Sequence, residues 1–191
     1  MNILTYAASS GQLPELYVSG AKRLGQVAAQ RGHAIVNGAG RTGLMGAVTE
    51  GVMQAGGKAI GVIPQFMVEH GWQHTGMTEL VITEDMHTRK EQMAQRSDAV
   101  IALPGGVGTM EELLEIITWK QLGLYLKPIV IFNIDHYFDP LLQQLSKAID
   151  QNFMRNFHNR LWCVAETPEE AVTLCETTPA WDPGLTKYAA I

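Results

Sequence analysis

A glycine-rich stretch between an apolar segment and a helix-forming segment has the residue types of an anion site. Residues 99–103 (AVIAL) are typical of a buried strand, residues 104–109 (PGGVGT) form a loop, and a helical pattern follows. Glycines allow positive φ and close backbone approach, so consecutive N–H groups can converge on one point in front of a helix N-terminus. The natural ligand of such a loop is an anion, most often a phosphate.

A carboxylate close to this loop has two interpretations. Thr109 and Glu112 have the T-x-x-E spacing of a capping box, in which each side chain satisfies the other residue's backbone N–H. Alternatively, Glu111 and Glu112 would repel a bound phosphate unless cations lie nearby, and a carboxylate at Glu112 then indicates chemistry beside the phosphate. The local pattern leaves both interpretations open.

Arg89 and Lys90 are the candidate cations, on a predicted helix that begins at Asp85. Met86 and Met93 mark the inward apolar stripe of this helix, and the two cations flank the stripe, which turns them partly inward. Cations in such positions usually have an anion to meet. The alternative is an exposed i, i+4 ion pair between Asp85 and Arg89.

A second glycine loop, residues 38–43 (GAGRTG), lies between a predicted strand at 33–37 and a predicted helix at 44–55. It fits the G-x-G-x-x-G pattern of dinucleotide-binding proteins, which requires an acidic residue at the end of the next strand. That strand, residues 58–63, ends without an acid, so the pattern argues against NAD.

The elements that must position these residues alternate regularly along the chain. Predicted strands cover 2–6, 33–37, 58–63, 79–83, 99–103, 128–133 and 161–164, with helices at 14–30, 44–55, 85–96, after 109, at 140–150 and at 168–176. Several strands are continuously apolar, as in parallel sheets covered on both faces. The pattern predicts an α/β fold with a doubly wound, Rossmann-like, mostly parallel sheet in a single domain. Residues 1–178 would form this domain and 179–191 a C-terminal tail, loose or packed on a partner; residues 65–78 would form a loop or short helix over the site.

Composition narrows the class of protein. The 191 residues are 46% hydrophobic and 17% charged, with a net charge of −5, which argues against a nucleic-acid surface. No window resembles a secretory signal or a membrane span, so we expect a cytoplasmic protein. Cys163 and Cys175 suggest neither a disulfide framework nor a zinc site, and His70 and His74 lack the further ligands of a metal centre.

The predicted helix after the first loop is apolar on two faces. One stripe comprises Met110, Leu113, Leu114 and Ile117, and the opposite side, which has Glu112, comprises Ile116 and Trp119. One stripe can cover the sheet and the other needs a second cover. We therefore predict a homodimer with its active site near the interface.

Two long segments, DMHTRK (85–90) and PGGVGTMEE (104–112), resemble the paired signature of the Lonely Guy family of cytokinin riboside 5′-monophosphate phosphoribohydrolases. The segments NGAGRTGLMGAV, GVIP and ITWKQLG resemble its other blocks, so the similarity covers roughly residues 1–165. Members have often been labelled lysine decarboxylases. No context marks Lys58, Lys120 or Lys127 for the Schiff base that a pyridoxal phosphate enzyme requires.

The resemblance implies a dimeric enzyme without metal or cofactor that hydrolyses the N-glycosidic bond of a nucleoside 5′-monophosphate, such as AMP or a cytokinin riboside 5′-monophosphate. The products would be the free base and ribose 5-phosphate. The resemblance implies catalytic roles for Arg89 and Glu112. Substrate contacts would fall on Met86, Lys90, Gly105, Gly106, Val107, Gly108, Thr109, Met110 and Thr118.

The chain departs from the family pattern at two places. Ala39 interrupts a frequent glycine triplet, and Gly71 replaces a glutamate that often contributes to the substrate site, with Glu69 two places earlier. We therefore expect base or sugar recognition to differ. The alternative function is a non-catalytic nucleotide or cofactor carrier that uses the same loops, which would give Glu112 no role beyond capping.

Overall fold

The protein is organised around a seven-stranded sheet in which all paired strands are parallel. The structure is a computed structural model and describes residues 1–188. The strands are β1 (Asn2–Tyr6), β2 (Ala34–Asn37), β3 (Ala59–Pro64), β4 (Glu79–Thr83), β5 (Ala99–Ala102), β6 (Ile129–Phe132) and β7 (Cys163–Ala165). Their order across the sheet is β4-β3-β2-β1-β5-β6-β7.

The strand order reverses beside β1, which pairs with β2 on one side and with β5 on the other. Ile3 lies opposite Ile35 in β2 and opposite Ala99 in β5, and all three side chains are completely buried. In a doubly wound sheet such a reversal opens a crevice at the carboxyl ends of the strands, where ligands bind. The loops that follow β1, β2 and β5 meet at this crevice.

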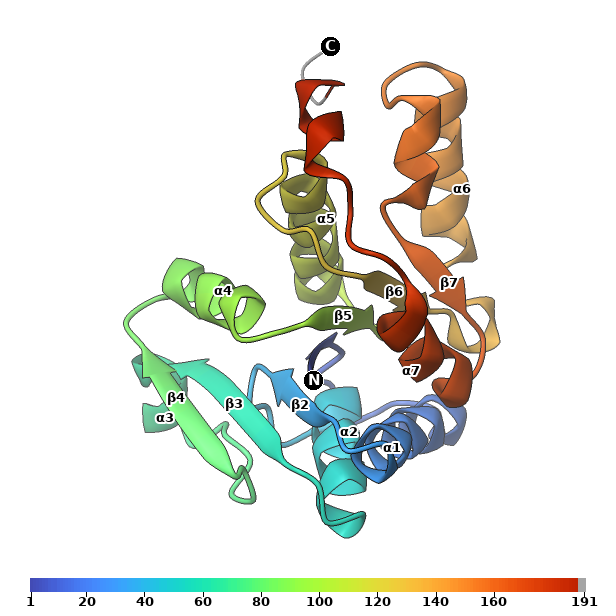
Figure 1. Ribbon diagram of the computed structural model, residues 1–191. Coiled ribbons are helices and arrows are strands. Elements are labelled where there is room, and N and C mark those ends of the chain that lie inside the picture. The colour runs from blue at the N-terminus through green and yellow to red at the C-terminus, as the bar shows by residue number, and fades with distance from the viewer. Residues whose placement is uncertain (189–191) are drawn as a thin grey trace.

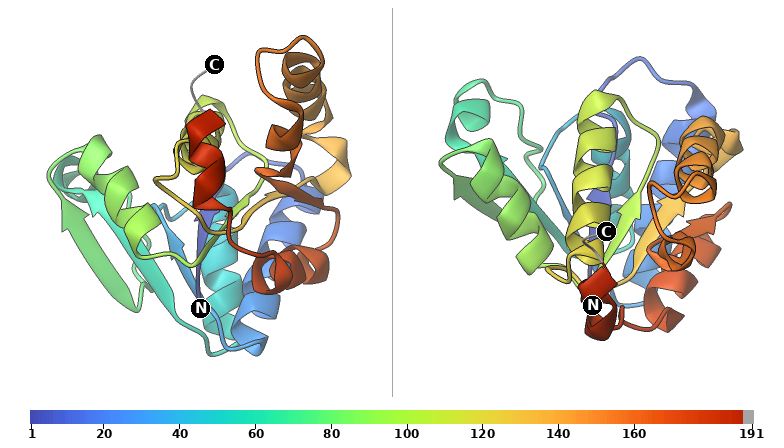
Figure 2. Two further views of the ribbon diagram at one scale, coloured as in Figure 1. Left: turned by 45° about the horizontal axis from the view of Figure 1, so that its top comes forward. Right: turned by 90° about the horizontal axis from the view of Figure 1, so that it is seen from above.

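Helices cover both faces of the sheet (Figure 1). α1 (Glu15–Gln30), α2 (Gly43–Gln54) and α7 (Pro168–Thr177) pack on one face, and α4 (Met86–Gln95), α5 (Val107–Gln121) and α6 (Asp139–Asp150) pack on the other. Figure 2 shows α4 and α5 next to each other on the second face. The short elements are α3 (Gln65–Glu69) and the 3₁₀ helices η1 (Ile134–His136), η2 (Asn156–Arg160) and η3 (Pro183–Tyr188).

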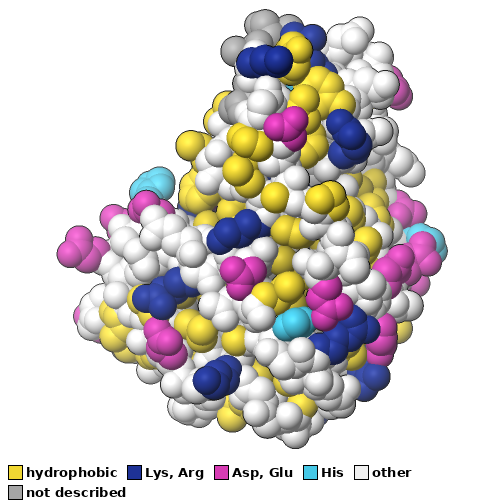
Figure 3. Space-filling view, viewed as in Figure 1, with side chains coloured by type: hydrophobic (Ala, Val, Ile, Leu, Met, Phe, Trp, Pro, Cys, Tyr) yellow, Lys and Arg dark blue, Asp and Glu magenta, His cyan; other side chains and the backbone are white. Residues whose placement is uncertain are grey.

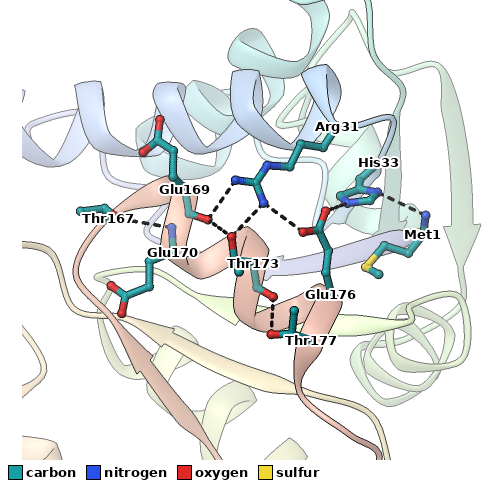
Figure 4. Close-up of polar contacts among 9 residues, drawn as sticks. All are labelled: Met1, Arg31, His33, Thr167, Glu169, Glu170, Thr173, Glu176 and Thr177. Atoms are coloured by element: carbon teal, nitrogen blue, oxygen red, sulfur yellow. Dashed lines mark hydrogen bonds and ion pairs between the residues drawn. The ribbon is translucent and has the colours of Figure 1, made fainter.

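A polar network joins α7 to the end of α1 and the start of β2 (Figure 4). Arg31 Nη1 donates to Thr173 Oγ1 at 2.9 Å and to Glu176 Oε2 at 3.0 Å. The imidazole of His33 lies 2.7 Å from the other oxygen of Glu176. These partly exposed contacts align the last helix with the first, while buried apolar side chains between them supply most of the stability.

The predicted fold class is confirmed, and each predicted strand and helix is present, with ends displaced by two residues or fewer except at the start of α5. Residues 65–78 begin with α3 and continue as a loop. The displacement at α5 is important for the site, because this helix begins at Val107 and not after Thr109.

The predicted division of α5 into two apolar stripes is wrong in detail. Leu113 and Ile117 are buried as predicted, but Ile116 is buried with them, and Leu114 is 38% exposed. The prediction that Met86 points inward is also wrong, because its side chain is 37% exposed while Met93 is buried. Met86 is the first residue of α4, so its side chain lies at the end of the apolar stripe and is not covered as Met93 is.

The described part of the predicted tail packs on its own chain. Trp181 is buried, and its backbone N–H donates to the carbonyl of Leu126 at 2.7 Å. Its ring stacks on Phe157 with a centroid distance of 6.3 Å. Residues 189–191 lie outside the described residues. Within residues 1–188, no helix combines the length and the apolar character needed to cross a membrane.

Lys120, on α5, is 2% exposed, and its ammonium group has no hydrogen bond or ion pair within residues 1–188. Burial lowers its pKa from 10.5 to about 8. The folded state therefore binds fewer protons than the unfolded state between these two values, and stability rises with pH across that window. Below pH 8 the buried charge destabilises the fold, on the order of 3 kcal/mol, because folding lowers the proton affinity of the amine more than a hundredfold and each tenfold change is worth about 1.4 kcal/mol.

We expect Lys120→Met to raise the free energy of unfolding at pH 7, and this gain to shrink above pH 8 as the wild-type amine loses its proton. Urea denaturation of both proteins from pH 7 to pH 10 measures it. Lys147→Met, which removes an exposed lysine from α6, is the control and should have little effect. Equal stability of Lys120→Met and the wild type at pH 7 would contradict the prediction.

Candidate functional site

The first glycine loop forms the N-terminus of α5 beside the switch point of the sheet. The N-cap residue is Gly106, and no side chain accepts a hydrogen bond from the first turn of the helix. The first N–H groups of α5 therefore lack both intrahelical and side-chain acceptors. Added Cβ atoms at Gly106 or Gly108 would meet nothing within 4 Å, whereas one at Gly105 would overlap the buried hydroxyl of Thr109. The loop is therefore open where an anion would approach and closely packed behind.

Glu112 does not belong to a capping box. Because α5 begins at Val107, Thr109 is its third residue and Glu112 its sixth, too far along the helix to cap its N-terminus. The carboxylate points to α4, where its Oε1 accepts a hydrogen bond of 2.8 Å from Nη1 of Arg89. Of the two interpretations that the sequence left open, the capping box is excluded.

Arg89 is held by groups from three elements. Besides Glu112 on α5, its Nε donates to the carbonyl of Val62 in β3 at 3.2 Å. Its Nη2 lies against Gly38, after β2, so closely that any Cβ at Gly38 would overlap it. The predicted alternative pair with Asp85 does not form, because Asp85 caps α4 by accepting from the N–H of Thr88 at 2.8 Å.

The Arg89–Glu112 pair is almost completely removed from water, with the two residues 5% and 8% exposed. Burial raises the pKa of Glu112, and the opposing positive charge of Arg89 only partly offsets this. A buried carboxylate of raised pKa binds a proton more readily than an exposed one, which suits a group that must accept a proton from water. Tyr6, at the end of β1, lies in the same electrostatic environment, and its pKa is raised by burial and by the charge of Glu112.

Lys90 lies on another side of α4. Its ammonium contacts Glu111 at 2.5 Å and Glu115 at 3.0 Å, and it lines a groove between α4 and α5. Burial acts to lower its pKa, but the two carboxylates outweigh burial and the pKa is raised. The structure thus places the two predicted cations apart, with Arg89 in the crevice and Lys90 in the groove.

Two cavities flank the catalytic candidates. The smaller, of about 250 Å³, is lined by Ala8, Ser10, Leu13, Pro14, Tyr17, Leu44, Pro104, Gly105, Gly106 and Tyr137. The larger, of about 420 Å³, is lined by Ser9, Gly38, Gly40, Arg41, Thr42, Met45, Ile63, Met67, Trp72 and Arg89. Cavities of this size at the switch point of an α/β sheet are typical binding sites for small ligands.

The other predicted contact residues lie at both ends of α5 and at the start of α4. Val107 is 86% exposed, Met110 is half-buried, and Thr118 is exposed on the outer side of the helix. Met86 lies at the surface of α4. Among residues 1–188, no cluster of three His, Cys, Asp or Glu side chains could hold a metal ion.

Several residues of the crevice had no clear signal in the sequence. Tyr137 donates from its hydroxyl to the carbonyl of Gly105 at 2.7 Å and so fixes the loop from a distant part of the chain. Trp72 approaches the second glycine loop because its carbonyl accepts from the N–H of Arg41 at 3.1 Å. Ser9 and Ser10 follow β1 at the switch point. Only their position directly after the first strand could have indicated that they line the crevice.

Comparisons with known proteins agree with this architecture. A family model described as "Possible lysine decarboxylase" matches residues 45–175. A cytokinin riboside 5′-monophosphate phosphoribohydrolase of Arabidopsis thaliana is 40% identical over 176 residues, which cover 92% of this chain and 81% of the relative. One from Oryza sativa subsp. japonica is 39% identical over 184 residues, which cover 96% of this chain and 76% of the relative.

Solved structures share the fold at lower identity. The molybdenum cofactor carrier protein of Chlamydomonas reinhardtii aligns with a TM-score of 0.68 at 20% identity, covering 92% of this chain and 95% of that protein. The molybdenum cofactor binding protein of Rippkaea orientalis gives 0.67 at 22%, covering 92% and 94%. The family match and the identity to the plant enzymes show that this chain belongs to the Lonely Guy family, whose model is described as possible lysine decarboxylase.

Proposed function

We propose that the protein hydrolyses the N-glycosidic bond of a nucleoside 5′-monophosphate such as AMP, releasing the free base and ribose 5-phosphate. The observation that supports this most strongly is Glu112, a buried carboxylate of raised pKa that is hydrogen-bonded to Arg89 beside an uncapped helix N-terminus. The relatives named as cytokinin riboside 5′-monophosphate phosphoribohydrolases support the same reaction.

In the proposed reaction the N-terminus of α5 holds the phosphate. Its free N–H groups and its dipole favour an anion, and the exposed glycines let the phosphate approach the backbone. The fixed phosphate then positions the ribose, so that binding energy far from the reacting bond is converted into rate.

Glu112 acts at the anomeric carbon. As the C1′–N bond breaks, its electron pair leaves with the base and positive charge develops on the sugar, which the carboxylate stabilises. Water attacks C1′, Glu112 takes the proton that the water loses, and this proton passes on to the departing base, which restores the carboxylate. Arg89 orients the carboxylate and offsets its repulsion of the phosphate.

A carrier that binds nucleotides without turnover would use the same loops. The carrier hypothesis gives Glu112 no role other than capping the helix. Because α5 begins at Val107, Glu112 lies too far along the helix to have that role. Incubating the protein with AMP and measuring free adenine by liquid chromatography separates the two functions. Binding of AMP without release of adenine would support the carrier and overturn the proposed hydrolase.

We further propose a homodimer that uses the outer face of α5. Exposed apolar side chains follow one side of this helix and continue past its end, namely Val107 (86%), Leu114 (38%), Leu122 (46%) and Leu124 (72%). Figure 3 shows hydrophobic side chains gathered over the region of α5 and the C-terminal segment. Such a face suits a second copy. Sedimentation as a monomer at micromolar concentration would contradict the dimer.

A further inference from the structure

The larger cavity begins on the side of Arg89 that faces away from Glu112. Glu112 binds Nη1 of the guanidinium, whereas Nη2 lies against Gly38, which lines the cavity. The smaller cavity lies at Gly105 and Gly106. Arg89 therefore lines the larger cavity, and the smaller cavity lies at the glycine loop that begins α5.

Consecutive residues after β1 line the two cavities. Ala8 and Ser10 line the smaller one and Ser9 lines the larger one, so the cavities are neighbours along this segment. A nucleotide with its phosphate at the N-terminus of α5 and its C1′ beside Glu112 has the larger cavity as the space for its base.

Trp72 supplies an aromatic wall to this cavity, while Met45, Ile63 and Met67 supply its aliphatic walls. The indole is 48% exposed, and its ring lies 4.9 Å from the ring of His70 at an angle of 39°. An aromatic ring that is half-exposed inside a cavity has free area on which a planar ligand can stack.

The backbone of Trp72 is fixed on both sides. Its N–H donates to the carbonyl of Met67 at 3.2 Å, and its carbonyl accepts from the N–H of Arg41 at 3.1 Å. The next residue, Gln73, forms an antiparallel bridge with Gly40. Gly71, in a left-handed conformation with φ of 68°, lets the chain turn between α3 and this bridge. The backbone of Trp72 is thus held beside the second glycine loop by contacts that do not involve the indole.

We propose that Trp72 is the platform on which the nucleobase stacks, and that it favours the two-ring purine over a pyrimidine. This inference rests on the proposed function, because the proposed position of the phosphate directs the base into the larger cavity. Stacking on an aromatic ring depends on shared area, so the bicyclic base gains more from the indole than a single ring does.

The test is equilibrium binding of AMP, CMP and ribose 5-phosphate to proteins that carry Glu112→Gln, so that AMP is not consumed. These proteins have the wild-type residue, alanine (Trp72→Ala) or phenylalanine (Trp72→Phe) at position 72. We expect Trp72→Ala to weaken AMP binding about tenfold, to weaken CMP binding less, and to leave ribose 5-phosphate binding unchanged. Trp72→Phe should restore most of the affinity for AMP. AMP should also quench tryptophan fluorescence in the protein that has Trp72, and Trp72→Phe should abolish most of this quenching.

Phe66→Ala is the matched control, because Phe66 lies in the same segment, is 42% exposed and does not line the cavity. It should leave AMP binding unchanged. If Trp72→Ala binds AMP as the protein that has Trp72 does, or loses ribose 5-phosphate equally, the stacking platform is refuted. Because binding is measured, the result is independent of turnover: AMP that binds through Trp72 but is not hydrolysed by the wild type refutes only the hydrolase.

Discussion

Replacing Glu112 with glutamine is expected to reduce the release of adenine from AMP at least about a hundredfold while leaving AMP binding nearly unchanged. The amide has almost the shape of the carboxylate, but it can neither take a proton from water nor stabilise a cationic sugar. The measurement is adenine release under saturating AMP, together with AMP affinity by calorimetry.

The neighbouring glutamate provides a matched control on the same helix. The side chain of Glu111 is 52% exposed and pairs with Lys90, so Glu111→Gln removes the same charge without touching Arg89. We expect this variant to lose less than about tenfold in activity. Hydrolysis of AMP by Glu112→Gln at the parental rate would show that another group performs the chemistry.

Adding one methyl group at Gly38 should be nearly as damaging as removing the carboxylate. Its Cβ would occupy the position of Arg89 Nη2, so the guanidinium must move and its bonds to Glu112 and Val62 must change. We expect Gly38→Ala to lose activity on the order of a hundredfold, because small displacements of a catalytic group are costly. The melting temperature and the rate of adenine release are measured together.

A double-mutant cycle tests whether this loss acts through Arg89. If it does, Gly38→Ala combined with Arg89→Ala should be no less active than Arg89→Ala alone. Gly11→Ala is the steric control, since an added Cβ there meets nothing within 4 Å. Additive losses in the double variant would show that the methyl group acts elsewhere.

The fold could be predicted from the sequence because the patterns that indicate strands and helices are local and repeat along the chain. Continuous apolar strands such as residues 99–103, alternating with amphipathic helices, leave little choice besides a parallel sheet covered on both faces. The rule that ligands bind at the carboxyl ends of strands then located both glycine loops in one crevice.

The pairing of Arg89 with Glu112 was harder to predict because it depends on where two helices begin. Asp85 as N-cap sets the rotation of α4 and turns Arg89 inward, and Gly106 as N-cap places Glu112 one and a half turns into α5. A capping box at Thr109 has the same local pattern as a catalytic carboxylate. Only the tertiary contact distinguishes them.

The walls of the larger cavity could not be predicted, since they combine segments that are distant in sequence. Trp72 reaches the second glycine loop through backbone hydrogen bonds, which no side-chain pattern encodes. The same limitation explains why the position of Leu114 was predicted wrongly. Its apolar side chain suggested a core position, but Leu113, Ile116 and Ile117 are the residues of this helix that are buried against the sheet.

The three contacts of Arg89 also have a mechanical consequence. Val62 and Gly38 belong to the half of the sheet that extends from β1 toward β4, and Glu112 follows β5 in the other half. A single guanidinium therefore links the two halves of the sheet across the switch point. Any displacement of this group changes its hydrogen bonds to both halves at once.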